Sequence, residues 1–169
     1  GRVLDPEYVS AATSWARAQG LATHLDGARI FNAAVASGQT PAALAEGFDT
    51  VSICLSKGLG APVGSVLVGP AQVIACARRW RKMLGGGMRQ SGVLAAAALH
   101  ALDHHVDRLA EDHARAARLA KGLGRARAIE VRACHTNMVF IDVPLARLDA
   151  LRRHLEAAGI RASIGYLPS

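Results

Sequence analysis

Apolar residues recur along this chain of 169 residues with two different spacings. Between Asp5-Pro6 and Gly20 they fall every three or four positions, which predicts a helix that begins at a capping aspartate and ends at a glycine. The same spacing predicts further helices, and short apolar or β-branched runs predict strands. These helices are expected at 41–46, 70–82, 91–123 and 145–158, and the strands at 21–25, 50–55, 63–68 and 139–141. Strands separated by helices are typical of an α/β fold.

The strands expected at 50–55 and 63–68 are joined by too few residues for a helical crossover. They should therefore pair antiparallel or lie in different places of one mixed sheet.

The segment 91–123 is predicted as one long amphipathic helix, whose buried stripe includes Leu109, His113 and Leu119. The pattern changes from short strands to this long helix after a triple glycine. We therefore expect one domain over 1–90 and a second over 91–169.

The composition narrows the classes of protein to which the chain can belong. Hydrophobic residues make up 51% of the chain and charged residues 20%. This composition can form a core, and no apolar run is long enough to cross a membrane. Three cysteines, Cys54, Cys76 and Cys134, do not make a secreted disulfide framework, so a reducing, cytoplasmic setting is expected. The chain begins at Gly1 without a charged-then-apolar segment, so no targeting peptide is expected.

The formal net charge is +7, which raises nucleic acid as a partner. Aromatic residues make up only 4% of the chain, too few for platforms on which bases stack, and zinc-finger and RNA-binding motifs are absent. A small anionic ligand is therefore expected, without nucleic acid. His100 and His104 have the i, i+4 spacing of metal ligands, but no third ligand is evident in the pattern. No metal site is expected.

Two residues that follow predicted strands, Lys57 and Asp26, are the candidate catalytic residues. Lys57 follows the apolar run 50–55 and is one of three lysines in a chain with seventeen arginines. A lysine can lose its proton and form a Schiff base, whereas an arginine cannot. Asp26 follows the strand expected at 21–25, and strand ends are where open α/β sheets bind ligands. The alternatives are a solvated loop lysine and an aspartate that serves a turn. Together, an acid and an imine-forming amine suit pyridoxal phosphate.

Four longer segments of the sequence resemble one enzyme family. They are HLDGARIFNAAVASG, SICLSKGLGAPVGSVLVG, RRWRKMLGGGMRQSGVLAAAALHALD and TNMVFIDV. In these segments the chain is similar to the low-specificity threonine aldolases, which have the aspartate-aminotransferase-like fold type I and depend on pyridoxal 5'-phosphate. The resemblance runs from about residue 1 to the C-terminus and rests on long, consecutive motifs.

The resemblance implies an α/β fold that comprises the C-terminal part of the large cofactor-binding domain, with a mixed, mostly parallel sheet, and most of a small α+β domain. It implies that Lys57 is the Schiff-base lysine, that Asp26 partners the pyridine nitrogen, and that Arg29 is a second cofactor-site residue. Lys82 and Arg89 match positions in a loop near the active site of the same or a neighbouring subunit. The implied protein is a homodimer or homotetramer.

The activity that the resemblance implies is cleavage of L-threonine, L-allo-threonine and related β-hydroxy-α-amino acids to glycine and an aldehyde. Family members are longer, with an N-terminal half that supplies phosphate-binding glycines and a histidine stacked on the cofactor, and with an arginine beyond the position of Ser169. We therefore expect an internal fragment that is inactive alone. The alternatives are a β-eliminating lyase or a transaminase with the same Asp26 and Lys57, or a non-catalytic remnant.

Overall fold

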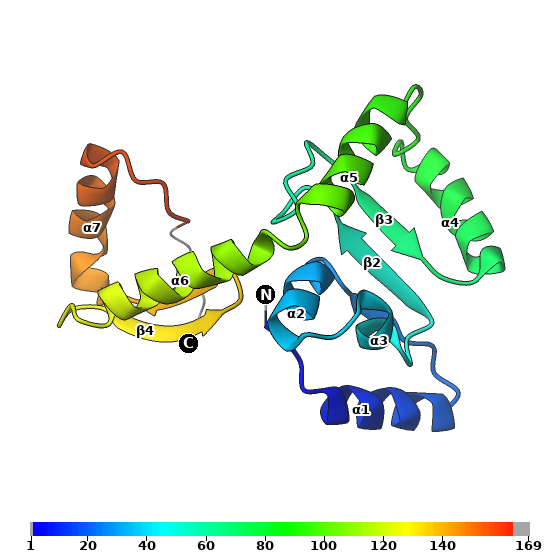
Figure 1. The fold of residues 1–169 in the computed structure, drawn as a ribbon, viewed down its shortest axis with the longest axis horizontal. Coiled ribbons are helices and arrows are strands. Elements are labelled where there is room, and N and C mark those ends of the chain that lie inside the picture. Colours follow the sequence, from blue (N-terminus) through cyan, green and yellow to red (C-terminus); the bar gives the residue numbers. More distant parts are fainter. Residues whose placement is uncertain (1, 164–169) are drawn as a thin grey trace. The chain divides into compact units, whose positions relative to one another are not determined.

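The computed structural model of the chain describes residues 2–163 (Figure 1). They form two compact units. The first unit runs to Ala116 and includes His135–Met138, and the second comprises Ala117–Cys134 and the chain from Val139 onward. The domain boundary expected after residue 90 stays a prediction.

The first unit holds most of the helices and a three-stranded sheet. Its elements are α1 (Pro6–Ala18), β1 (His24–Asp26), α2 (Ile30–Ser37), α3 (Pro41–Ala45), β2 (Thr50–Cys54), β3 (Ser65–Val68), α4 (Ala71–Met83), α5 (Gly92–His104) and the first half of α6 (Leu109–Leu123). Polar caps start two of the helices. Asp5 accepts a hydrogen bond from the backbone N–H of Glu7 at 2.8 Å at the start of α1, and Thr40 accepts one from Ala43 at the start of α3.

The second unit contains the end of α6, most of the strands β4 (Glu130–His135) and β5 (Met138–Asp142), and the helix α7 (Leu145–Ala157). The strands β4 and β5 form a two-stranded sheet of their own. β5 and α7 match the strand expected at 139–141 and the helix expected at 145–158, whereas β4 was not predicted.

The sheet of the first unit has the strand order β1-β2-β3. β1 runs parallel to β2, with Asp26 opposite Ser52, and β2 runs antiparallel to β3. The mixed sheet is thus confirmed, and of the two arrangements expected for 50–55 and 63–68 the antiparallel pairing is the one found. After β1 the chain turns at Gly27, where a Cβ atom would lie 2.9 Å from the carbonyl oxygen of Ser52. Only glycine lets the turn pass so close to β2, and this turn leads directly into α2, which sequence analysis did not expect.

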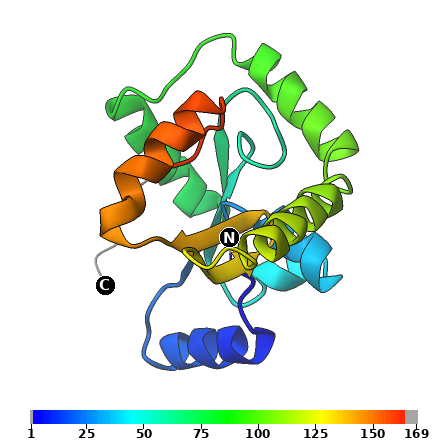
Figure 2. The ribbon, with the colours of Figure 1, turned by 90° about the vertical axis from the view of Figure 1, so that its left-hand side faces the viewer.

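The prediction of one helix over 91–123 is wrong, because the chain turns between α5 and α6 (Figure 2). At this turn the Nδ1–H of His105 donates a 2.6 Å hydrogen bond to the carbonyl oxygen of Leu59. Leu109 then starts α6 and is 1% exposed. Leu119, which was expected in the buried stripe, is 55% exposed. The free energy gained by burying Leu109 and by the hydrogen bond from His105 to Leu59 therefore exceeds what a continuous helix would gain at this turn.

The core of the first unit lies between the chain that follows β2 and the helices α5 and α6. Its buried residues are Leu55, Leu59, Ala61, Ala98, Ala101 and Leu109, and Phe31 and Val35 of α2 pack against them. Among the described helices, none combines the length and the apolar character that crossing a membrane requires.

Candidate active site

Asp26 and Arg29 lie on either side of the Gly27 turn and face one cavity. The cavity has a volume of about 500 Å³, and its walls come from β1, α1, α2 and α3. Asp26 is exposed at the end of β1, and its Oδ1 accepts a 3.1 Å hydrogen bond from the backbone N–H of Ala28. This bond holds the carboxylate at the strand end and leaves its other oxygen available to a ligand in the cavity.

Arg29 precedes α2, and its side chain is partly buried. Its Nε is buried, and in the described part of the chain it has no hydrogen-bond partner. A buried N–H group without an acceptor costs about 1–3 kcal/mol, so this nitrogen favours an acceptor that would come from outside the described residues. Asp26 and Arg29 thus present one negative and one positive group to the same cavity.

Lys57 lies in the loop after β2, and its side chain is exposed. The loop is held by main-chain hydrogen bonds from Gly60 to Lys57 at 2.9 Å and from Ala61 to Leu55 at 3.0 Å. Lys57 does not line the cavity that Asp26 faces. However, β1 and β2 are parallel neighbours, so Asp26 and Lys57 both lie at or beyond the carboxyl ends of adjacent strands. The structure therefore brings both residues to the side of the sheet at which the parallel strands have their carboxyl ends, where open α/β sheets bind their ligands.

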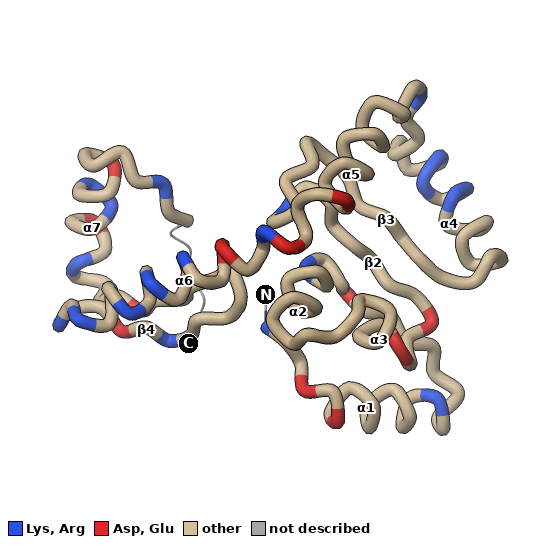
Figure 3. The backbone as a smooth tube through the Cα atoms, in the orientation of Figure 1, with Lys and Arg blue, Asp and Glu red and all other residues tan. Residues whose placement is uncertain are grey.

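Lys82 and Arg89 lie farther along the chain, in the last turn of α4 and after the triple glycine. Both are exposed, and the Lys82 side chain lies against Gly87, where a Cβ would be 2.9 Å from its Cδ. The basic residues of α4 have no acidic neighbour on that helix (Figure 3). Between these two residues and Asp26, Arg29 or Lys57, the described residues form no hydrogen bond or ion pair.

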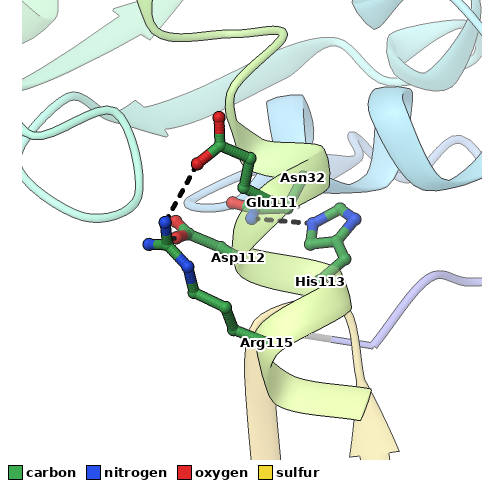
Figure 4. Close-up of polar contacts among 5 residues, drawn as sticks. All are labelled: Asn32, Glu111, Asp112, His113 and Arg115. Atoms are coloured by element: carbon green, nitrogen blue, oxygen red, sulfur yellow. Dashed lines mark hydrogen bonds and ion pairs between the residues drawn. The ribbon is translucent and has the colours of Figure 1, made fainter. Parts of the chain in front are cut away.

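A polar pair that sequence analysis missed lies beside the Lys57 loop. Asn32 of α2 is 3% exposed, and its Nδ2 donates a 3.1 Å hydrogen bond to Nε2 of His113 on α6 (Figure 4). Because an amide nitrogen only donates, the accepting Nε2 carries no proton and the imidazole is neutral. Burial lowers the pKa of His113, and nearby Asp112 opposes this effect. The one signal in the sequence was an asparagine among the apolar residues of IFNAAVA, at positions 30–36.

The lowered pKa of His113 makes the stability of the protein depend on pH. Below its ordinary pKa of about 6.5 the unfolded chain binds a proton that the folded chain resists. The contribution of neutral His113 to stability is thus fully present above about pH 6.5 and is lost as the pH falls through its folded-state pKa. We expect the Tm of a His113→Gln variant to fall less than that of the unchanged protein between about pH 7 and pH 5.

Thermal unfolding monitored by circular dichroism at stepped pH measures this difference. The matched control is His154→Gln, because His154 is exposed on α7. An equal fall in Tm for the His113→Gln variant and the unchanged protein would contradict the assignment.

Comparison with known proteins places the chain in a family. The sequence profile of the beta-eliminating lyases matches residues 1–146. The chain is 49% identical over 160 residues to the low specificity L-threonine aldolase of Escherichia coli (strain K12), a match that covers 95% of this chain and 48% of that protein. It is 39% identical over 175 residues to the low specificity L-threonine aldolase of Saccharomyces cerevisiae, covering 98% of this chain and 45% of that one. The chain belongs to the beta-eliminating lyase family, and it spans about half the length of these relatives.

Two crystal structures share the fold. One is a protein of Exiguobacterium sp. 255-15 assigned as an aromatic amino acid beta-eliminating lyase/threonine aldolase, with a TM-score of 0.77, 26% identity, and coverage of 90% of this chain and 44% of that one. The other, from Listeria monocytogenes EGD-E and assigned as an L-allo-threonine aldolase, has a TM-score of 0.82 at 21% identity, covers 95% of this chain and 46% of that one, and supports the fold alone. The family resemblance and the α/β fold expected from the sequence are confirmed.

Proposed function

We propose that the complete protein is a pyridoxal phosphate-dependent aldehyde-lyase that cleaves L-threonine, L-allo-threonine and related β-hydroxy-α-amino acids to glycine and an aldehyde. The observation that carries this proposal is the placement of Asp26 and Lys57 after adjacent parallel strands. The identity to the two low-specificity threonine aldolases supports the choice of reaction.

The residues at the carboxyl ends of β1 and β2 fit the cofactor. The buried Nε of Arg29 needs an acceptor, and the anionic oxygens of pyridoxal phosphate supply acceptors of this kind. Asp26 would hold the pyridine nitrogen through its carboxylate, and Lys57 would hold the cofactor covalently through its amine. When bound, pyridoxal phosphate supplies an electron sink for the carbanion at the α-carbon of the substrate.

The chain's own residues then have separate tasks. Asp26 keeps a proton on the pyridine nitrogen, because a carboxylate beside that nitrogen favours its charged form. Arg29 orients the cofactor from the cavity wall. Lys57 is exposed, so the amine that would hold the cofactor is accessible to the amine of an incoming substrate.

We further propose that Lys82 and Arg89 approach the active site of this or a neighbouring subunit in a homodimer or homotetramer. Neither side chain takes part in an ion pair within the part of the chain that the structure describes, and two such basic groups suit an anionic group on the cofactor or substrate. We also propose that the protein works in the cytoplasm and has neither nucleic-acid nor membrane partners.

The test is a product assay on the full-length gene product loaded with pyridoxal phosphate. With L-threonine or L-allo-threonine we expect equal amounts of glycine and acetaldehyde, which together account for all atoms of the substrate. Ammonia and a 2-oxo acid would instead identify a β-eliminating lyase, and a 2-oxo acid formed only with an added amino acceptor would identify a transaminase. No product at all would favour a non-catalytic remnant.

A further inference from the structure

We propose that Asn32 and His113 are positioning residues for Lys57 and act on it through the main chain of Gly58. The inference rests on the proposed function, because that function is what requires Lys57 to be held in place.

The first step is the contact at Gly58, the residue after Lys57. A Cβ atom on Gly58 would lie 2.8 Å from Cδ2 of Leu109 and 3.3 Å from Oδ1 of Asn32. The main chain of Gly58 therefore lies close to both α6 and α2, and a side chain there would have to displace the Leu109 methyl group and crowd the Asn32 amide. A shift of the Asn32 amide toward the loop would move Gly58, and with it the Cα of Lys57.

The second step is the bond that fixes the amide. Asn32 is 3% exposed, so its amide cannot turn to water for hydrogen bonds. The Nε2 of His113 accepts from Nδ2 at 3.1 Å, and the amide so held lies against Gly58, with Oδ1 at 3.3 Å and Nδ2 at 3.5 Å from the position of a Cβ atom there. Without this acceptor, the amide would lose the bond that selects its orientation.

The third step is the contact at Leu59, the second residue after Lys57. Leu59 is 3% exposed, and its carbonyl oxygen accepts the 2.6 Å bond from His105 in the turn between α5 and α6. Both residues after Lys57 are thus held from neighbouring helices, whereas the Lys57 side chain is exposed. The arrangement fixes the backbone that carries the amine and leaves the amine free to move.

The experiment uses the full-length gene product without cofactor or substrate, and compares His113→Leu with His113→Gln. Leucine fills similar space without an acceptor, while glutamine can place an amide oxygen near the position of Nε2. Two readouts are measured by mass spectrometry. They are hydrogen exchange at the backbone of residues 58–60, and the rate at which acetic anhydride modifies Lys57 relative to Lys121, which is exposed on α6.

We expect His113→Leu to raise exchange at residues 58–60 by roughly five- to tenfold, the factor that corresponds to one lost buried hydrogen bond. The relative modification rate of Lys57 should change with it, and His113→Gln should restore both values. Val35→Ala is the control for a general loss of stability, because Val35 packs against the same core but is not among the atoms nearest to Gly58. It should leave both readouts unchanged.

A second variant tests the contact from the loop side. Gly58→Ala places a methyl group against Leu109 and Asn32 and should raise exchange at residues 59–60 even where His113→Leu does not fold. The proposal is overturned if leucine and glutamine at position 113 give the same exchange, if Val35→Ala matches His113→Leu, or if Gly58→Ala leaves the loop unchanged. None of these readouts depends on the reaction catalysed, so a failed product assay and a failed positioning role are told apart.

Discussion

Replacing Lys57 by alanine is expected to abolish covalent binding of pyridoxal phosphate by the full-length gene product. The unchanged protein should show the yellow absorbance of a cofactor joined to a lysine, and borohydride should trap that link on Lys57. Alanine offers no amine, so the absorbance and the trapped adduct should both disappear, and lyase activity should fall by several orders of magnitude.

Two further variants make this test specific. Lys57→Arg keeps the positive charge but cannot form the link, so it should behave like the alanine variant. Lys121→Ala removes an exposed lysine of α6 and should keep both the absorbance and the adduct. A borohydride-reducible adduct that persists in Lys57→Ala would show that another amine binds the cofactor.

Asp26→Ala should have the opposite signature, with the covalent link retained and turnover lost. Without the carboxylate the pyridine nitrogen is less readily protonated, and the cofactor becomes a weaker electron sink. Loss of one such charge-assisted partner corresponds to about 2–4 kcal/mol, or roughly a 30- to 1000-fold fall in kcat.

Steady-state kinetics with L-threonine measures this fall. Asp26→Asn should come close to the alanine variant, because an amide removes the charge while keeping the shape. Asp103→Asn, at an exposed position of α5, is the control and should leave kcat unchanged. An unaltered kcat in both Asp26 variants would refute the role of this carboxylate.

Sequence reasoning was most successful where the physical cause is local. A few residues between 50–55 and 63–68 cannot hold a crossover helix, so chain length limited β2 and β3 to antiparallel pairing or separate places in one mixed sheet, and the first arrangement is the one found. The placement of Asp26 at the end of a strand followed from the glycine beside it. Lys57 was recognised because lysine is rare in this chain. Its role, like those of Asp26, Arg29, Lys82 and Arg89, stays a prediction.

The turn between α5 and α6 and the pair of Asn32 and His113 were not predicted, because both depend on contacts between residues far apart in the sequence. Apolar spacing continues through the turn between α5 and α6, so nothing local marks the end of α5. The turn depends on the bond from His105 to Leu59, which lie 46 positions apart. The bond between Asn32 and His113 spans 81 positions. Contacts of this range depend on the packing of whole helices, which hydrophobic periodicity in a single sequence does not specify.

In the described residues β1 forms one edge of its sheet, and this placement has a consequence for how the pocket can be extended. A further strand laid parallel to the outer side of β1 would lie about 4.8 Å away and would bring its own carboxyl end next to Asp26. A strand added outside β3 would instead be separated from Asp26 by two strands. Any polypeptide that enlarges this sheet at β1, whether from the same protein or from another copy, would therefore contribute the next wall of the cavity that Asp26 lines.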